Sequence, residues 1–236
     1  MKAIIPAAGH GTRFLPVTKV IPKEMLPIGS RPALQLIVEE AKQAGADEII
    51  LVISHDKEMI RRYFADDPSV RFVYQEEQKG LGHAVLQAAV DCDRVLVLLG
   101  DALIAGGNAS KELAAVSAAH DGAGVIGLER VPQAKVSRYG IVEMSGERIV
   151  DMVEKPSVED APSDLAIAGR YLLEAGIFDY LRTQTPGKGG EIQLTDAIRR
   201  MLKDRPLYGC VYSGKRQDIG NPKGYFEALK AMGENQ

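Results

Sequence analysis

The sequence has 236 residues, of which 45% are hydrophobic and 26% charged, and its formal net charge is −3. This is the composition of a globular protein that can bury a sizeable core, and it argues against electrostatic binding of nucleic acid or membranes. Cys92 and Cys210 form neither a zinc pattern nor a disulfide framework. With no signal-peptide pattern and no apolar stretch that could span a bilayer, we expect a cytoplasmic protein.

Short apolar runs alternate with helical patterns over the first 130 residues. Strands are expected at residues 3–5, 49–53, 70–74, 95–99 and 124–128. Amphipathic helices are expected around residues 34–41, 56–64, 82–90 and 110–119. The strands are continuously rather than alternately hydrophobic, which indicates cover on both faces. The pattern predicts a three-layer, Rossmann-like α/β fold with a mostly parallel sheet and ligands beyond the carboxyl ends of the strands.

The pattern changes after Arg138. Alternating hydrophobicity at 139–144 and 148–153 predicts a small antiparallel extension around a turn at 145–147. Further elements are expected at 166–173 and 207–212 (strands) and at 174–182, 194–202 and 224–232 (helices). No interdomain linker is evident. We therefore expect one domain covering residues 1–236, with halves at about 1–130 and 131–236.

The first expected strand runs directly into small and polar residues at 7–13. Small residues let backbone N–H groups approach an anion closely, and Arg13 adds a bidentate donor for phosphate oxygens. The loop lacks the P-loop pattern, and Phe14 replaces the third small residue of a dinucleotide-binding loop. Taken alone, it could be a plain structural turn. Lys23, in a segment stiffened by two prolines, presents a second cation.

Residues 9–16 and 22–27 together resemble the signature of the sugar-phosphate nucleotidyltransferases, and most of all the bacterial UTP–glucose-1-phosphate uridylyltransferases. The resemblance implies that residues 1–130 bind the NTP and residues 131–236 the sugar phosphate. In the family, the first motif surrounds the NTP phosphates, its Arg contacts the departing pyrophosphate, and the Lys lies near the reacting centre. The residues given these nucleotide-binding roles are Ala8, Gly9, Gly11, Thr12, Arg13 and Lys23.

Gln75 and Gly80 are candidates for recognition of the base. A Gln amide matches the donor and acceptor pattern of a pyrimidine edge, and a nearby glycine lets backbone groups approach the base. Taken alone, these two residues are better explained as a surface Gln at a strand end and a turn glycine. The resemblance favours base recognition, because the family recognises its pyrimidine with a Gln followed five positions later by a Gly.

The resemblance extends to the sugar-phosphate half. There the family uses a Glu to accept hydrogen bonds from sugar hydroxyls, the neighbouring Lys to hold the sugar phosphate, and a Tyr-Gly backbone to approach the ring. The residues implied here are Tyr139, Gly140, Glu154, Lys155, Ala168 and Glu191. A Glu-Lys pair is also common on solvated surfaces. Thr195 and Asp196, in a further family motif, could simply begin a helix.

Two aspartates are the candidate metal ligands. Asp101 follows the strongly apolar run 95–99, and Asp218 follows the late strand. The family uses two such aspartates to hold Mg²⁺, which needs only one or two carboxylates when phosphates supply other oxygens. The resemblance implies that the sugar phosphate attacks the α-phosphorus of the NTP, with Arg13, Lys23 and Lys155 as catalytic cations. Expected substrates are UTP and glucose 1-phosphate.

Some positions depart from the family pattern and leave substrate preference open. Gln217 stands where the family usually has His, Gly190 where an acidic residue is frequent, and the insertion between the second and third strands is short. A thymidylyltransferase remains an alternative, since uracil and thymine share their hydrogen-bonding edge. A non-catalytic nucleotide-sugar-binding regulatory protein and a dinucleotide-dependent dehydrogenase are weaker alternatives. The resemblance also implies a homo-oligomer.

Overall fold

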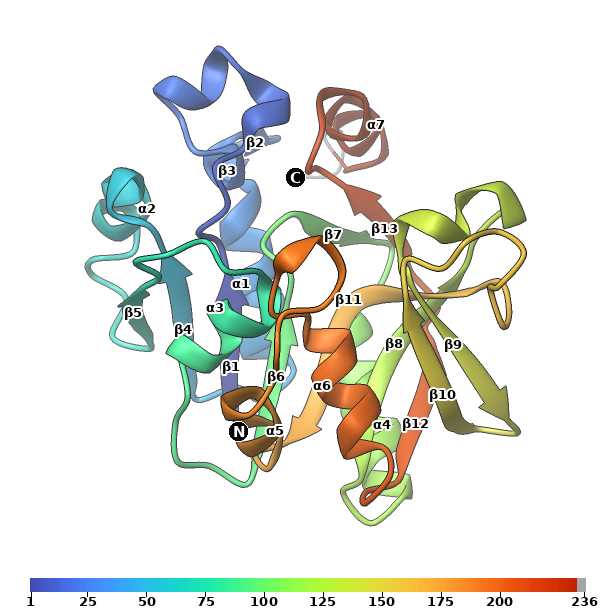
Figure 1. Cartoon of the computed structure of the whole chain (residues 1–236). Coiled ribbons are helices and arrows are strands. Elements are labelled where there is room, and N and C mark those ends of the chain that lie inside the picture. The colour runs from blue at the N-terminus through green and yellow to red at the C-terminus, as the bar shows by residue number, and fades with distance from the viewer. Residues whose placement is uncertain (233–236) are drawn as a thin grey trace.

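The computed structural model describes residues 1–232, and its centre is a sheet of nine strands (Figure 1). Across the sheet the strands follow the order β5-β4-β1-β6-β11-β8-β12-β10-β9. Their bounds are Lys2–Pro6 (β1), Glu48–Ile53 (β4), Val70–Tyr74 (β5), Arg94–Leu98 (β6), Gly124–Arg130 (β8), Gly140–Ser145 (β9), Arg148–Glu154 (β10), Leu165–Glu174 (β11) and Leu207–Val211 (β12). Every strand expected from the sequence is present, with small shifts at its ends.

Strand direction differs between the two halves of the sheet. Strands β5, β4, β1 and β6 are parallel to one another, as predicted. In contrast, β11 runs antiparallel to both β6 and β8, and β10 runs antiparallel to β12 and β9. The sheet is therefore mixed and less parallel than expected. The reason is that β11 is buried along almost its whole length, and hydrophobicity reports cover on both faces but not direction.

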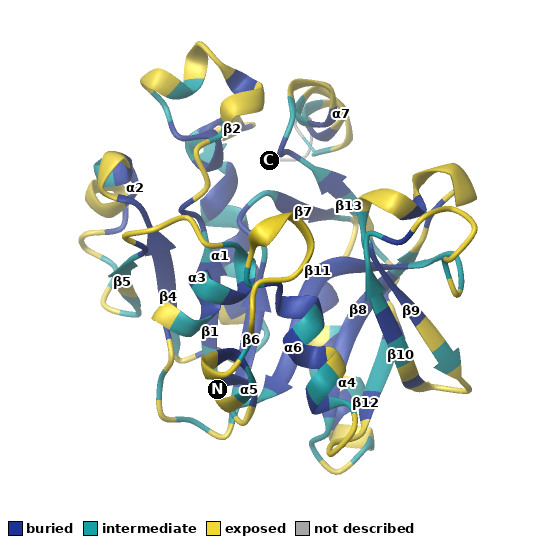
Figure 2. Cartoon of the chain, viewed as in Figure 1, coloured by how far each residue is buried: buried dark blue, intermediate teal, exposed yellow. Residues whose placement is uncertain are grey.

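Helices cover both faces of this sheet, which confirms the predicted three layers (Figure 2). The α-helices are Ala33–Gln43 (α1), Glu58–Tyr63 (α2), Leu81–Gln87 (α3), Ala109–Ala119 (α4), Ile177–Arg182 (α5), Leu194–Met201 (α6) and Pro222–Met232 (α7). On β1, Ala3 and Ile5 pack in the cluster with α1 and α4, whereas Ile4 packs with α3, α5 and α6. Within residues 1–232, no helix is long and apolar enough to cross a membrane.

The antiparallel extension is formed by β9 and β10. Arg148 is paired with Ser145 beside the turn, so the predicted hairpin is confirmed. Its second strand also pairs with β12 through Arg148 and Ile149. The extension is therefore a continuation of the main sheet, and α6 packs against β10 from one side.

Short strands outside the main sheet were not expected from the sequence. Strand β7 (Ala102–Ala105) pairs antiparallel with β13 (Lys215–Asp218), and β2 (Pro27–Ile28) pairs with β3 (Arg31–Pro32). Each has at most four residues, too few for hydrophobic periodicity to be recognised. The β7–β13 pair matters most for function, because it joins segments more than a hundred residues apart in sequence.

Candidate active site

The glycine-rich loop follows β1 at the carboxyl edge of the parallel strands. The N–H of Ala7 still donates to the carbonyl of Val52 at 2.8 Å, which fixes the start of the loop. Gly11 adopts a left-handed φ of +65° before the short 3-10 helix η1 (Thr12–Phe14), and a Cβ there would lie 2.9 Å from Cγ2 of Thr18. The Thr18 hydroxyl also donates to the Gly11 carbonyl. A glycine is therefore required at this bend for steric as well as backbone reasons.

Lys23 begins the 3-10 turn η3 (Lys23–Met25) and points toward the end of β6. Its Nζ lies 2.5 Å from Oδ2 of Asp101, and its side chain is only 11% exposed. Burial opposes the charge on both groups, but their mutual attraction outweighs it. The pKa of Lys23 is raised and the pKa of Asp101 is lowered, the latter helped by Arg13 and Arg216. Both groups are therefore charged at neutral pH.

A buried ion pair lies directly behind Lys23. Nζ of Lys57 lies 2.8 Å from Oε2 of Glu24, and the same ammonium donates to the carbonyl of Ala7 at 2.6 Å. Both charged side chains are almost completely buried. Lys57 therefore ties the beginning of the glycine-rich loop to the segment that carries Lys23. Neither residue could be singled out from the sequence, because a Lys and a Glu 33 positions apart give no local signal.

The two candidate metal ligands converge, although 117 positions separate Asp101 from Asp218 in the sequence. Register pairing of β7 with β13 sets Asp218 opposite Ala102, and the N–H of Ile219 donates to the Asp101 carbonyl at 2.9 Å. A Cβ on Gly220 would lie 2.9 Å from Oδ1 of Asp218 and 3.0 Å from Oδ2 of Asp101. Both carboxylates therefore face the small space that this glycine leaves open.

This donor set fits a hard divalent cation. Within residues 1–232 no group of three or more His, Cys, Asp or Glu side chains is arranged to hold a metal. Mg²⁺ does not need one, because it is commonly bound by one or two carboxylates, water and substrate phosphates. Asp101 and Asp218 are therefore the residues that would hold such an ion.

The predicted base-recognition residues lie together at the end of β5. Gln75 is buried, and Nε2 of its amide lies 3.3 Å from the Gly80 carbonyl and 2.9 Å from Nδ1 of His83. Gly80 has a φ of +102°, and a Cβ there would lie 2.7 Å from Cβ of Glu191. His83 had no role assigned from the sequence.

The predicted sugar-phosphate residues form a second group around the ends of β9 and β10. Oε1 of Glu154 lies 3.1 Å from Nζ of Lys155, and Oε2 of Glu154 accepts a hydrogen bond from the Thr195 hydroxyl at 2.7 Å. The N–H of Lys155 donates to the Tyr139 carbonyl at 3.0 Å. A Cβ on Gly140 would lie 3.2 Å from both Oε2 of Glu154 and Oγ1 of Thr195, so a side chain there would crowd this cluster.

Thr195 thus has a role other than the helix-start alternative considered from the sequence. Helix α6 begins at Leu194 with Gln193 as its N-cap residue, and no side chain caps it. The hydroxyl of Thr195 instead orients the Glu154 carboxylate. Asp196 faces Gly187, where an added Cβ would meet its carboxylate oxygen.

Ala168 and Glu191 lie differently from the rest of the predicted sugar-phosphate group. The methyl group of Ala168 is buried in the hydrophobic cluster with α1 and α4, so this side chain is not available to a ligand. Glu191 lies against Gly80, and its carboxylate accepts a hydrogen bond from Gln193 at 3.1 Å. The neighbouring Ile192 exchanges backbone hydrogen bonds with Lys79 and Gly82. Glu191 therefore borders the base-recognition loop.

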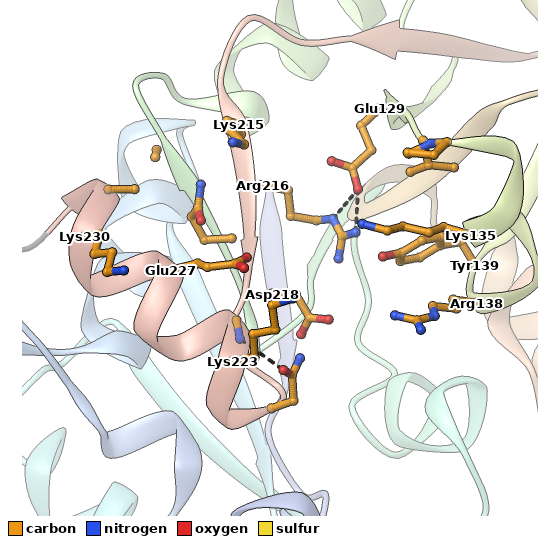
Figure 3. Close-up of a pocket in the computed structure, with 17 residues that line it drawn as sticks. Glu129, Lys135, Arg138, Tyr139, Lys215, Arg216, Asp218, Lys223, Glu227 and Lys230 are labelled. Carbon is orange, nitrogen blue, oxygen red and sulfur yellow. Dashed lines mark hydrogen bonds and ion pairs between the residues drawn. The ribbon is translucent and has the colours of Figure 1, made fainter.

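A cavity of about 630 Å³ opens between α7 and the 3-10 helix η5 (Gln133–Arg138), with Asp218 and Tyr139 in its wall (Figure 3). Arg216 also lines the cavity. Nη2 of Arg216 lies 2.5 Å from Oε1 of Glu129, and its guanidinium carbon lies 4.8 Å from the centre of the Tyr139 ring. Arg216 was not among the residues expected from the sequence. Its position two residues before Asp218 on β13 was the available signal.

The fold and the site define an α/β enzyme that handles phosphorylated nucleotides: a glycine-rich loop and a fixed lysine lie beside two converging carboxylates. The chain belongs to the nucleotidyl transferase family, whose model matches residues 2–235. Enzymes of this family generally use a divalent metal ion. The dehydrogenase alternative is therefore not supported.

Individual relatives cover almost the whole chain. A UTP–glucose-1-phosphate uridylyltransferase from Staphylococcus haemolyticus is 44% identical over 257 residues, which cover 95% of this chain and 89% of the relative. A crystal structure of UDP-glucose pyrophosphorylase complexed with UDP-glucose has a TM-score of 0.92 at 37% identity, covering 100% of this chain and 99% of that chain. A UTP-bound UGPase from Acinetobacter baumannii has a TM-score of 0.82 at 34% identity, covering 99% and 95%.

Proposed function

We propose that the protein transfers the uridylyl group of UTP to glucose 1-phosphate, giving UDP-glucose and pyrophosphate. The names of the similar proteins support this choice of substrates. The observation that carries the chemistry is the convergence of Lys23, Asp101 and Asp218 at the carboxyl edge of the sheet, next to the glycine-rich loop. Two anionic reactants repel each other, so a site that joins them must first supply positive charge.

An oxygen of the sugar phosphate is the nucleophile and forms a bond to the α-phosphorus, while the bond from that phosphorus to the β-phosphate oxygen breaks. The nucleophile is already an anion at neutral pH, so no general base is required. Arg13 and Lys23 neutralise the phosphates of the NTP, and Lys155 holds the sugar phosphate. Asp101 and Asp218 would hold Mg²⁺, which would further neutralise the phosphate oxygens.

Recognition is divided between the two halves of the chain. Residues 1–130 hold the NTP, with Ala8, Gly9, Gly11 and Thr12 lining its phosphates and Gln75 and Gly80 reading its base. Residues 131–236 hold the sugar phosphate through Tyr139, Gly140 and Glu154. A homo-oligomeric state and a cytoplasmic location stay predictions from the sequence.

The direct test is a panel of the four common NTPs and dTTP against several hexose 1-phosphates, following pyrophosphate release in the presence of Mg²⁺. We expect UTP with glucose 1-phosphate to give the highest kcat/KM. A preference for dTTP would instead indicate a thymidylyltransferase. Binding of UTP without pyrophosphate release from any pair would indicate a non-catalytic nucleotide-sugar-binding protein.

A further inference from the structure

The amide of Gln75 is held in one orientation by two neighbours. Its Nε2 lies 2.9 Å from Nδ1 of His83 and 3.3 Å from the carbonyl oxygen of Gly80. Gln75 is only 4% exposed, and its own N–H donates to the Ile53 carbonyl at 2.9 Å. An amide nitrogen carries two N–H donors. Both are used by these two acceptors, so Oε1 is the part of the amide left to a ligand.

The acceptor at Gly80 cannot easily move. A Cβ on Gly80 would lie 2.7 Å from Cβ of Glu191 and 2.9 Å from the Ile192 carbonyl oxygen, so the glycine backbone is tightly packed against the 191–192 segment. The N–H of Gly82 also donates to the Ile192 carbonyl at 2.8 Å. His83 is the other acceptor. Its ring determines whether Nε2 of Gln75 stays turned toward the protein or can turn toward a bound base.

His83 can accept this hydrogen bond only as a neutral ring with a free lone pair on Nδ1. Burial and then the charge of Lys79 lower the pKa of His83 below its usual value, which favours the neutral ring at pH 7. The other ring nitrogen, Nε2, lies 3.2 Å from the amide nitrogen of Gln87. Gln87 is exposed, so its amide can turn and accept from Nε2–H. Nδ1 is then the acceptor for Gln75.

We propose that His83 is a positioning residue for base selection, because it fixes the Gln75 amide with the acceptor Oε1 facing the pyrimidine. The inference rests on the proposed function, in which Gln75 reads the base. Uracil and thymine carry a donor at N3–H and match an acceptor, whereas cytosine carries a lone pair at N3 and is repelled. Without His83 the amide can rotate and present its N–H groups to cytosine. His83 therefore excludes CTP but does not separate UTP from dTTP.

The test compares kcat/KM for UTP, CTP and dTTP in the wild type and in the His83→Ala variant, with glucose 1-phosphate and Mg²⁺. We expect the preference for UTP over CTP to fall about tenfold or more in the variant, since a site that hydrogen-bonds a substrate group rejects an analogue lacking it. Most of the loss for UTP appears in KM, because a base contact is equally strong in the ground and transition states. The ratio of UTP to dTTP stays the same.

Two further variants separate positioning from a general loosening of the loop. His83→Asn can place an amide oxygen near the position of Nδ1, so we expect it to retain more of the UTP preference than His83→Ala. His55→Ala removes an exposed histidine whose Nε2 lies 2.9 Å from Oε1 of Glu76, next to Gln75, and leaves the preference unchanged. If His83→Ala does not fold, the comparison of His83→Asn with the wild type decides.

An unchanged ratio of UTP to CTP in the His83 variants would overturn the inference, as would a wild-type enzyme that uses both nucleotides equally. Absence of pyrophosphate release from UTP in the wild type would overturn the proposed function itself. The two failures are therefore distinguishable in one set of assays.

Discussion

The ammonium of Lys23 and the carboxylate of Asp101, 78 positions apart in the sequence, lie 2.5 Å apart at the carboxyl edge of the sheet. The pair joins the segment after β1 to the end of β6, where nucleotide phosphates and metal are proposed to meet. Each partner keeps the other charged. Removing either side chain leaves the charge of the other uncompensated. Substituting Lys23 should therefore make the site more negative, and substituting Asp101 should make it more positive.

Lys23→Met is therefore expected to weaken UTP binding and to lower kcat by about a hundred- to a thousandfold, the typical effect of losing one well-placed group that stabilises developing charge. Asp101→Asn should lower turnover by a similar factor, but metal-free UTP should bind it at least as tightly as it binds the wild type. Steady-state kinetics and calorimetric titration with UTP measure both effects. Near wild-type kcat in either variant at saturating Mg²⁺ would contradict the assigned roles. Lys42→Ala, which removes an exposed pair with Asp67, is the control.

The Mg²⁺ requirement of the reaction should involve Asp218 as well as Asp101. We expect chelation of divalent ions to abolish turnover and added Mg²⁺ to restore it, because Asp101 and Asp218 face one space and supply only two of the ligands. Asp218→Asn should raise the Mg²⁺ concentration that gives half-maximal activity by about tenfold or more. Activity measured across a Mg²⁺ titration tests this. An unchanged midpoint would show that Asp218 does not bind the ion.

Strand positions and the glycine-rich loop could be predicted from the sequence, because each depends on local signals such as an apolar run or a cluster of small residues. Strand direction could not, since β11 is as continuously buried as a parallel strand. The convergence of Asp101 with Asp218 depends on the β7–β13 pairing, which brings together two short segments with no periodicity of their own. The family resemblance indicated those aspartates, but local pattern alone did not place them together.

The parts of the site missed from the sequence act through other residues. His83, Lys57 and Glu24 contact functional segments only after the chain has folded. Ala168 is the opposite case, a residue that the motif indicated but whose side chain faces elsewhere. Its motif indicated a sugar contact, yet its methyl group packs into the core. Sequence motifs identify which residues take part, but side-chain direction depends on long-range packing.

The hydroxyl of Thr195 should affect the sugar phosphate and not the nucleotide. It donates to Oε2 of Glu154 at 2.7 Å, and both side chains are largely buried. Thr195→Val keeps the shape but removes this donor, so the carboxylate loses its fixed orientation. We expect KM for glucose 1-phosphate to rise about tenfold while KM for UTP changes little. Equal increases in both KM values would show that the effect is general. Thr195→Ser, which retains the hydroxyl, should stay close to the wild type.

Acid stability should depend on the buried pair of Glu40 and Arg170. Nη2 of Arg170 lies 2.7 Å from Oε2 of Glu40, and Arg170 is fully buried. Burial acts against the Glu40 charge, but Arg170 and Ser110 outweigh it and lower the pKa of Glu40. The contribution of the carboxylate is therefore complete above its unfolded pKa, about 4.3, and is lost as pH falls through the lower folded value.

The Glu40→Gln variant should accordingly be less stable than the wild type by about 3–5 kcal/mol at pH 7, because Arg170 is left buried without a counter-charge. The difference should narrow below about pH 4, where the wild type also loses its carboxylate charge. Urea unfolding at a series of pH values measures the difference. A difference that stays constant down to pH 2 would contradict this origin.

The buried pair of Lys57 and Glu24 makes a similar prediction with a functional consequence. Lys57→Met removes the partner of Glu24 and the donor to the Ala7 carbonyl. We expect unfolding free energy to fall by about 3–5 kcal/mol, since a charge is left buried and unpaired. Adding Glu24→Gln should recover part of this loss, because the amide carries no charge. Urea unfolding of both variants measures the recovery.

The double variant also separates stability from positioning. Because Lys57 ties the glycine-rich loop to the Lys23 segment, Lys57→Met/Glu24→Gln should fold and still bind UTP more weakly than the wild type. The kcat/KM for UTP should fall, whereas KM for glucose 1-phosphate should change less, because the proposed sugar-phosphate residues lie around β9 and β10. Lys42→Met, at an exposed pair worth about 0–1 kcal/mol, is the matched control. If the folded double variant bound UTP normally, the pair would only stabilise the fold.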